Sequence, residues 1–88
     1  MFEWDETKRL KTLRERYLDF RDAHQIFAGR PVIHVRAQRN QEERFVSTAE
    51  IYGKLFTVVW TWRGNYQRVI PFRRARSAEE RAHRKIHG

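Results

Sequence analysis

Apolar residues recur along the chain with two different periods, and the period changes near residue 32. Before that point, leucines and a tyrosine recur at helical spacing between residues 10 and 17, behind Asp5, a residue type that caps helices. A second helix is predicted to begin after Asp19 and to stop before Pro31. Its predicted buried face consists of Phe20, Ala23, Ile26 and Phe27.

After residue 32 the pattern becomes strand-like, with β-branched and aromatic residues in short runs. Four strands are predicted, from the segments VIHVRA (32–37), RFVSTAEIY (44–52), KLFTVVWTW (54–62) and YQRVIPF (66–72). A polar loop, RNQEE, separates the first two. The third segment is largely apolar on both faces, which predicts a central strand that is covered on both sides.

Glycine and proline mark the connections between these strands. Gly53-Lys54 and Gly64-Asn65 each lie between strand segments, and glycine at the first position of a two-residue loop predicts a type II′ hairpin turn. Pro71 cannot donate to a sheet ladder. The fourth strand is therefore predicted to lie at an edge or to be broken at Pro71 by a bulge.

The last helix is predicted to begin at Ser77, because Ser77 and Glu80 fit the S-x-x-E capping box. The 88 residues are thus predicted to form one α+β domain. Two N-terminal helices pack on an antiparallel sheet of about four strands, and a C-terminal helix follows. Residues 2–4 are a candidate short edge strand.

Charge and composition narrow the choice of partner and compartment. The net charge of +8 favours a polyanionic partner, either nucleic acid or an acidic protein, although such charge can also serve solubility alone. The chain has no cysteine, which excludes disulfides and zinc–thiolate sites. The longest nearly apolar run, residues 55–62, is far too short to span a membrane, and the N-terminus lacks an apolar signal core. We therefore predict a cytoplasmic protein without membrane contact.

Arginines gather at the end of the third strand and along the fourth. They are Arg63, Arg68, Arg73 and Arg74. Guanidinium groups held by a sheet suit the phosphates of RNA, whereas the alternative is that they shield an edge strand from aggregation. The basic residues of the last helix, including Arg81, are interpreted as a source of general electrostatic attraction.

Trp60 and Trp62 are predicted to lie close to these arginines, because the hairpin at Gly64-Asn65 pairs the third strand with the fourth. Exposed tryptophans beside arginines can stack an unpaired base. The alternative interpretation is that both rings belong to the core.

His83 and His87 are four residues apart in the predicted last helix. The spacing suits a metal, but no carboxylate lies between them as in H-E-x-x-H, and we predict neither a metal site nor a cofactor. His83 is a candidate proton donor or acceptor, because imidazole changes charge near neutral pH. The alternative is a solvated helix residue.

Five segments, in order, resemble the BrnT toxins of bacterial type II toxin–antitoxin systems. They are FEWDETK (2–8), EERF (42–45), VVWTWRG (58–64), RVIPFRRA (68–75) and E-x-x-x-H (79–83). The resemblance covers nearly the whole chain. It implies a RelE-like fold and a small ribonuclease that arrests translation and is neutralised by a cognate antitoxin.

The resemblance extends to individual positions. Lys8 matches the N-terminal lysine of the family, and His83 falls where the family often has a tyrosine. The four sheet arginines also match. The chain departs from the family pattern at Arg16, near the place of a family histidine, and at Pro71-Phe72, where the family has Ser-Ala. Arg16 cannot replace a histidine as a base at neutral pH.

Two sets of site residues follow from the residue pattern and the resemblance. The predicted catalytic set is Lys8, Arg63, Arg73, Arg74 and His83. The predicted RNA-contacting set is Arg68, Trp60, Trp62 and Arg81.

The predicted function is that of a toxin: a metal-independent ribonuclease that cleaves mRNA and arrests translation. Such cleavage uses the 2′-hydroxyl as nucleophile and needs a base, cations for the developing charge, and an acid for the leaving 5′-oxygen. The resemblance implies two partners: RNA, either free or at the ribosome, and a BrnA-like antitoxin that is a DNA-binding repressor and joins the toxin in a heterotetramer. The alternative is a non-catalytic basic module that binds nucleic acid or the ribosome by charge.

Overall fold

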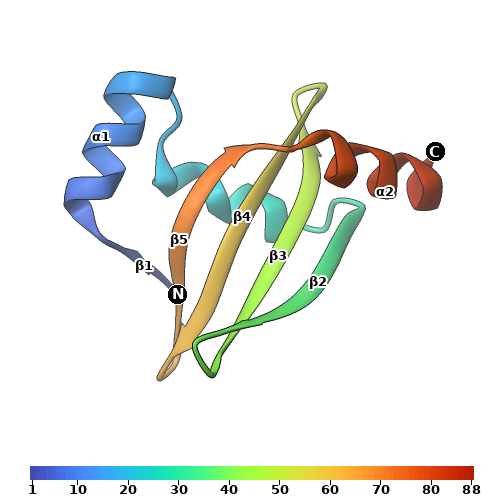
Figure 1. Cartoon of the computed structure of the whole chain (residues 1–88). Coiled ribbons are helices and arrows are strands. Elements are labelled where there is room, and N and C mark those ends of the chain that lie inside the picture. The colour runs from blue at the N-terminus through green and yellow to red at the C-terminus, as the bar shows by residue number, and fades with distance from the viewer.

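The computed structural model describes residues 1–88 as a five-stranded sheet with three helical segments (Figure 1). The elements, in chain order, are β1 (Phe2–Trp4), α1 (Glu6–Arg16), η1 (Phe20–Phe27), β2 (Val32–Arg39), β3 (Glu42–Ile51), β4 (Lys54–Arg63), β5 (Tyr66–Arg74) and α2 (Ser77–His87). The α+β class is confirmed, whereas the number of strands and the arrangement of the helices differ in detail from the prediction. None of the helices has the length and apolar composition that crossing a membrane requires.

The strand order is β1-β5-β4-β3-β2, with β4 at the centre as predicted. Strands β2 to β5 form an antiparallel meander. The expected short N-terminal strand exists, but β1 pairs with β5 in parallel, with Glu3 opposite Arg68. The sheet is therefore mixed, and the prediction of a purely antiparallel sheet is wrong. A parallel pair needs a long crossover between its strands, and here most of the chain intervenes.

Strand β5 carries a bulge at Pro71. Val58 pairs with Phe72 and Trp60 pairs with Val69, so the single residue between Val58 and Trp60 faces two residues of β5. Such a two-against-one count is the signature of a β-bulge. The predicted break at Pro71 is confirmed, and β1 accompanies β5 only as far as Val69.

The three hairpin turns are all two residues long. The first turn is Asn40-Gln41, which is shorter than the expected polar loop RNQEE, because β2 and β3 extend to the pair Arg39–Glu42. The next turn is Tyr52-Gly53 rather than Gly53-Lys54, with φ of 51° and 80°, which are the positive values of a type I′ turn. Gly64, with φ of 61°, occupies the first position of its turn as predicted.

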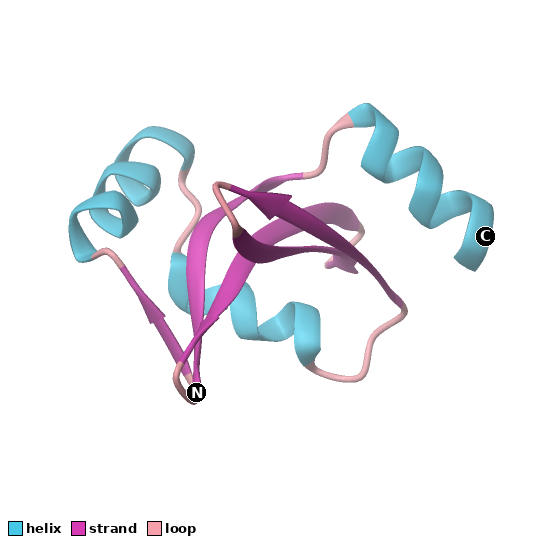
Figure 2. Ribbon diagram, turned by 60° about the horizontal axis from the view of Figure 1, so that its bottom comes forward, coloured by secondary structure: helices cyan, strands magenta, loops and turns pink.

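The segment η1 covers one face of the sheet, here called the η1 face (Figure 2). It is a 3-10 helix capped by Asp19, at the position of the predicted second helix. Phe20, Ala23 and Ile26 are buried as predicted, and they pack in one core with Val58 and Trp60 of β4. Phe27 is partly buried against the same core.

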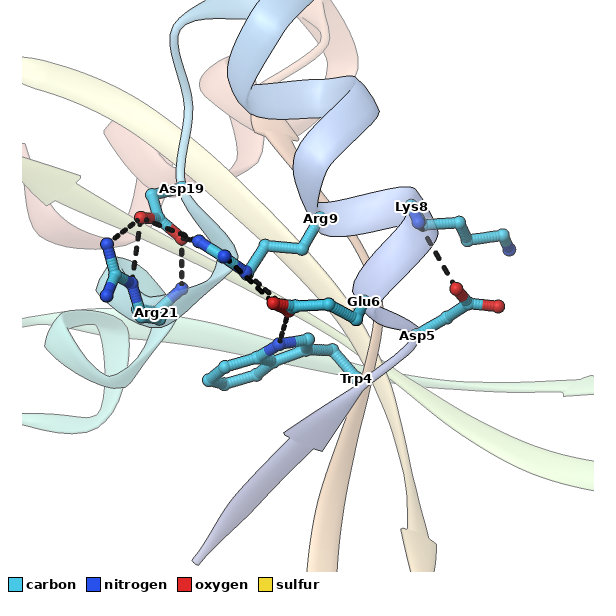
Figure 3. Close-up of polar contacts among 7 residues, drawn as sticks. All are labelled: Trp4, Asp5, Glu6, Lys8, Arg9, Asp19 and Arg21. Atoms are coloured by element: carbon cyan, nitrogen blue, oxygen red, sulfur yellow. Dashed lines mark hydrogen bonds and ion pairs between the residues drawn. The ribbon is translucent and has the colours of Figure 1, made fainter.

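Helix α1 does not bury an apolar face, which corrects the expectation that both N-terminal helices pack on the sheet. No residue of α1 is buried, and Leu10 is half exposed. Polar contacts tie the helix to η1 instead (Figure 3). Arg9 reaches Asp19, the cap of η1, at 3.1 Å, and also holds Glu6 at 2.6 Å. The side chains of Arg9 and Asp19 are each only 12% exposed, so this pair fixes where α1 lies.

Helix α2 lies on the opposite face, here called the α2 face, over β2 and β3 (Figure 1). It begins at Ser77 as predicted, but Arg76 is its cap and Glu79 its third residue. The Glu79 carboxylate accepts a hydrogen bond from the Arg76 backbone N–H at 2.8 Å. The predicted capping partners, Ser77 and Glu80, are therefore wrong by one residue.

Candidate functional site

Arg73 and Arg74 leave β5 on opposite faces of the sheet. Arg73 pairs with Thr57 in register and points to the α2 face, whereas Arg74 pairs with Phe56 and points to the η1 face. The two side chains therefore leave the strand in opposite directions, although both residues line the cavity between the end of α1 and the end of β5.

Arg73 is held by Glu79 of α2. The two Nη atoms lie 2.8 and 3.0 Å from the two carboxylate oxygens, and the Thr57 hydroxyl donates to the same carboxylate at 3.0 Å. The Arg73 guanidinium hydrogen bonds outweigh partial burial and lower the pKa of Glu79 to about 2. Arg73 is thus neutralised within the protein and fastens α2 to the central strands.

Arg74 has no carboxylate partner. Its guanidinium carbon lies 5.4 Å from the centre of the Phe56 ring, in a cation–π contact, and the side chain is exposed. Its charge is therefore available to an external anion.

A cavity of about 350 Å³ brings Arg74 together with His83. It lies between α2 and the turn from β3 to β4. Its titratable side chains are Glu50, Lys54, Arg74, Glu80, His83, Arg84 and His87. Cations, carboxylates and imidazoles thus share one solvent-accessible hollow.

His83 is mostly buried, with 8% of its surface exposed. Its Nε2 lies 3.2 Å from the carbonyl oxygen of Pro31, and that of His87 lies 3.1 Å from the carbonyl oxygen of Val32. A carbonyl can only accept, so we assign the hydrogen to Nε2 in both rings. Neutral His83 then keeps its lone pair on Nδ1, the nitrogen that can take a proton.

Arg63 and Arg68 lie at the other end of the sheet. Arg68 pairs with Thr61 and Arg73 pairs with Thr57. Arg68 and Arg73 are therefore separated by four residues along β4, or about 13 Å. Arg68 lies 3.7 Å from Glu3 of β1, whereas Arg63 is exposed and has no carboxylate partner.

The two tryptophans have different environments. Trp60 is 7% exposed, and its indole N–H donates to the Ser47 hydroxyl at 2.9 Å. Trp62 is 54% exposed and meets Trp60 edge to face at 5.3 Å between ring centres. Trp60 is therefore a core residue, and Trp62 alone offers surface for a base.

Lys8 and Arg81 stand apart from the cavity. Lys8 follows the Asp5 cap, and its ammonium points away from the ion pairs of Arg9 (Figure 3). Arg81 is exposed on α2 without a carboxylate partner.

The residue pattern missed Lys54, which lines the cavity beside Arg74. The predicted strand 54–62 places Lys54 at its start, and Lys54 is indeed the first residue of β4 and pairs with Ile51, outside the Tyr52-Gly53 turn. No three or more His, Cys, Asp or Glu side chains are grouped in a way that could hold a metal ion.

Comparison with known proteins gives one informative result. Curated proteins show no significant match to the chain. A protein-family model described as "Ribonuclease toxin, BrnT, of type II toxin-antitoxin system" matches residues 4–79 of the 88. The chain therefore belongs to the BrnT family of ribonuclease toxins of type II toxin–antitoxin systems.

Proposed function

We propose that this chain is a RelE-like, metal-independent endoribonuclease that cleaves mRNA and arrests translation in the cytoplasm. The observation that carries the proposal is the cavity that Arg74 and His83 line together in a chain of the BrnT family. An always-charged residue and an imidazole that line the same cavity can supply the cation and the base that cleavage by the 2′-hydroxyl requires.

The proposed reaction assigns one role to each of three side chains. The 2′-oxygen attacks the neighbouring phosphorus while its proton passes to Nδ1 of His83. Arg74 neutralises the charge that develops on the phosphorus-bound oxygens. The P–O5′ bond breaks, and the 5′-oxygen takes a proton from the Lys54 ammonium, leaving a 2′,3′-cyclic phosphate and a 5′-hydroxyl.

The other predicted site residues take supporting roles or none. Arg73 is proposed to position α2, and with it His83, through its ion pair with Glu79. Arg63 and Arg68 are proposed to attract the RNA backbone, as Arg81 does more diffusely. Trp62 can stack a base, whereas the proposal gives no RNA contact to Trp60 and no catalytic role to Lys8.

Cleavage by purified variants tests this proposal. His83→Gln can still donate to the Pro31 carbonyl but cannot accept a proton at a ring nitrogen, and Arg74→Met removes the charge. We expect each to lower the cleavage rate by about 100-fold or more. Lys85→Met, on the same helix but outside the cavity, serves as the control and should cleave normally.

Two outcomes would contradict the proposed catalytic residues or the proposed metal independence. One is full cleavage by His83→Gln and Arg74→Met; the other is cleavage that chelation of divalent metals abolishes. RNA binding that falls steeply with salt, without cleavage of any RNA, would support the alternative of a non-catalytic basic module.

The proposed partner is an antitoxin of the BrnA type, a DNA-binding repressor, that forms a heterotetramer with the toxin. It is proposed to cover the basic surface between Arg63 and Arg74 with added strands or an acidic helix. Arg68→Glu should weaken the complex and Lys11→Glu, on α1, should not. Size-exclusion chromatography with light scattering reports whether the complex forms and its stoichiometry, and a complex that forms only at low salt would contradict a defined interface.

A further inference from the structure

Two connected cavities form a groove on the η1 face, next to the cavity that holds His83. The first, about 590 Å³, lies between the end of α1 and the end of β5. The second, about 260 Å³, extends toward the Tyr52-Gly53 turn. Both are lined by Leu18, Lys54, Phe56 and Phe72, so they share one mainly apolar floor.

Cations dominate the walls of this groove. Arg16, Lys54, Arg74 and Arg76 line the first cavity, and none of them lies within ion-pair distance of a carboxylate. The first cavity has no acidic residue in its lining, and Asp22 is the one acidic residue in the second. The groove therefore presents uncompensated positive charge over an apolar floor.

Two tyrosines stand at its two ends. Tyr17 lines the first cavity and Tyr52 the second, and the two residues are 87% and 85% exposed. Both occupy the left-handed region, with φ of 58° and 51°. Tyr17 is the C-cap of α1 and Tyr52 the first residue of a type I′ turn, positions that favour glycine or asparagine. Neither ring contributes to the core, so folding alone explains neither tyrosine.

We propose that this groove binds single-stranded RNA, with bases stacked on Tyr17 and Tyr52 and phosphates held by Arg16, Arg74 and Arg76. Exposed rings beside unpaired arginines are the combination that single-stranded nucleic acids require, whereas an acidic peptide needs the charge alone. The inference rests on the proposed ribonuclease function. Lys54 and Arg74 line both the groove and the His83 cavity, so a strand in the groove is led directly to the reacting groups.

Binding of a ten-nucleotide 2′-O-methyl oligoadenylate tests this proposal, because that strand cannot be cleaved through its own 2′-oxygen. Fluorescence anisotropy is measured with the full chain and with Tyr17→Asn and Tyr52→Asn. Asparagine suits both backbone conformations, so these variants remove the rings without creating strain. Tyr→Phe variants keep the rings, and Leu10→Gln, on the exposed surface of α1 outside the groove, is the control.

We expect each asparagine variant to lose about tenfold in affinity, and the phenylalanine variants and Leu10→Gln to bind normally. An abasic strand of the same length should bind more weakly and be insensitive to the tyrosines. Unchanged affinity of the double asparagine variant would overturn the proposal. The proposal would also be overturned if the asparagine variants lost affinity for a polyglutamate peptide as strongly as for the oligoadenylate, because the groove would then be a site for an acidic peptide.

The two proposals fail in distinguishable ways. If the chain cleaves RNA but the tyrosine variants bind it normally, the groove assignment is wrong and the ribonuclease function stands. If the oligoadenylate binds through the tyrosines but no RNA is cleaved, the groove stands and the catalytic assignment is wrong.

Discussion

Arg73 of β5 and Glu79 of α2 meet in a two-point ion pair, with N–O distances of 2.8 and 3.0 Å. The same carboxylate accepts from the Thr57 hydroxyl and from the Arg76 backbone N–H. One carboxylate therefore joins the central strand, the last strand and the cap of the C-terminal helix.

Replacing this carboxylate should destabilise the domain. We expect Glu79→Gln to lower the free energy of unfolding by roughly 1–3 kcal/mol, because it breaks a charged hydrogen-bond network that is partly buried. Urea unfolding measures the effect. Glu80→Gln, which loses only a 3.6 Å pair with Arg84, should cost much less, and equal costs for the two variants would contradict the assigned role of Glu79.

Stability should fall in acid through Glu79 and Asp19. The pKa of Glu79 is lowered to about 2. Burial opposes ionisation of Asp19, but hydrogen bonds from Arg21 and Arg9 outweigh it and lower that pKa to about 2 as well. Both values lie below the ordinary 4.5 and 3.8, so the contribution is complete above about pH 4.5 and is lost as the pH falls toward 2.

Thermal unfolding between pH 7 and pH 2 measures this dependence. In Glu79→Gln the melting temperature should fall less steeply between pH 4.5 and pH 2, because the variant lacks one of the two groups that take up protons. An unchanged slope in that variant would show that other carboxylates control acid stability.

The two tryptophans of β4 should differ sharply in their effect on stability. Trp60→Ala opens a cavity in the core and leaves the Ser47 hydroxyl without its indole donor. We expect the free energy of unfolding to fall by about 3–5 kcal/mol. Trp62→Ala, at a half-exposed site, should cost less than about 1.5 kcal/mol. Chemical denaturation compares the two, and similar losses would contradict the environments described for the rings.

The Asn40-Gln41 turn offers a stabilising substitution. Gln41 has φ of 64°, which glycine adopts without strain, and Asn-Gly is the preferred type I′ pair. We expect Gln41→Gly to raise the free energy of unfolding by about 0.5–1 kcal/mol. The control is Gln38→Gly in β2, where the same change should lower the free energy of unfolding. A lower free energy of unfolding in both variants would argue against the type I′ geometry of the turn.

The sequence predicted those parts of the fold that local signals specify. The meander, its central strand and the break at Pro71 follow from alternation, glycine and proline within a few residues of each feature. The parallel strand β1 could not be paired in advance, since three residues hold no register information and their partner, near Arg68, is more than sixty positions away. The predicted cap of α2 is one residue too late because either Glu79 or Glu80 could complete a capping box. The ion pair between Glu79 and Arg73, which depends on the tertiary structure, favours Glu79.

The candidate site was predictable in composition but not in geometry. Strand alternation alone separates Arg73 from Arg74, yet only the fold shows that Arg73 is paired with Glu79 while Arg74 is unpaired and shares a cavity with His83. Lys54 could not be recognised while the position of its turn was uncertain by one residue. The groove joins the ends of α1 and β5 with the β3–β4 turn, which are brought together by tertiary packing.

Pro71 and the length of β1 decide where another chain can extend the sheet. Beyond Val69 the outer side of β5 is unpaired, but a proline and a bulge make it a poor template for a new strand. Strand β2 presents eight residues, Val32–Arg39, along an unbroken edge with no proline. Strand addition to this sheet should therefore occur beside β2, on the far side from β1, and a partner that covers the basic surface between Arg63 and Arg74 should do so with a helix rather than with added strands.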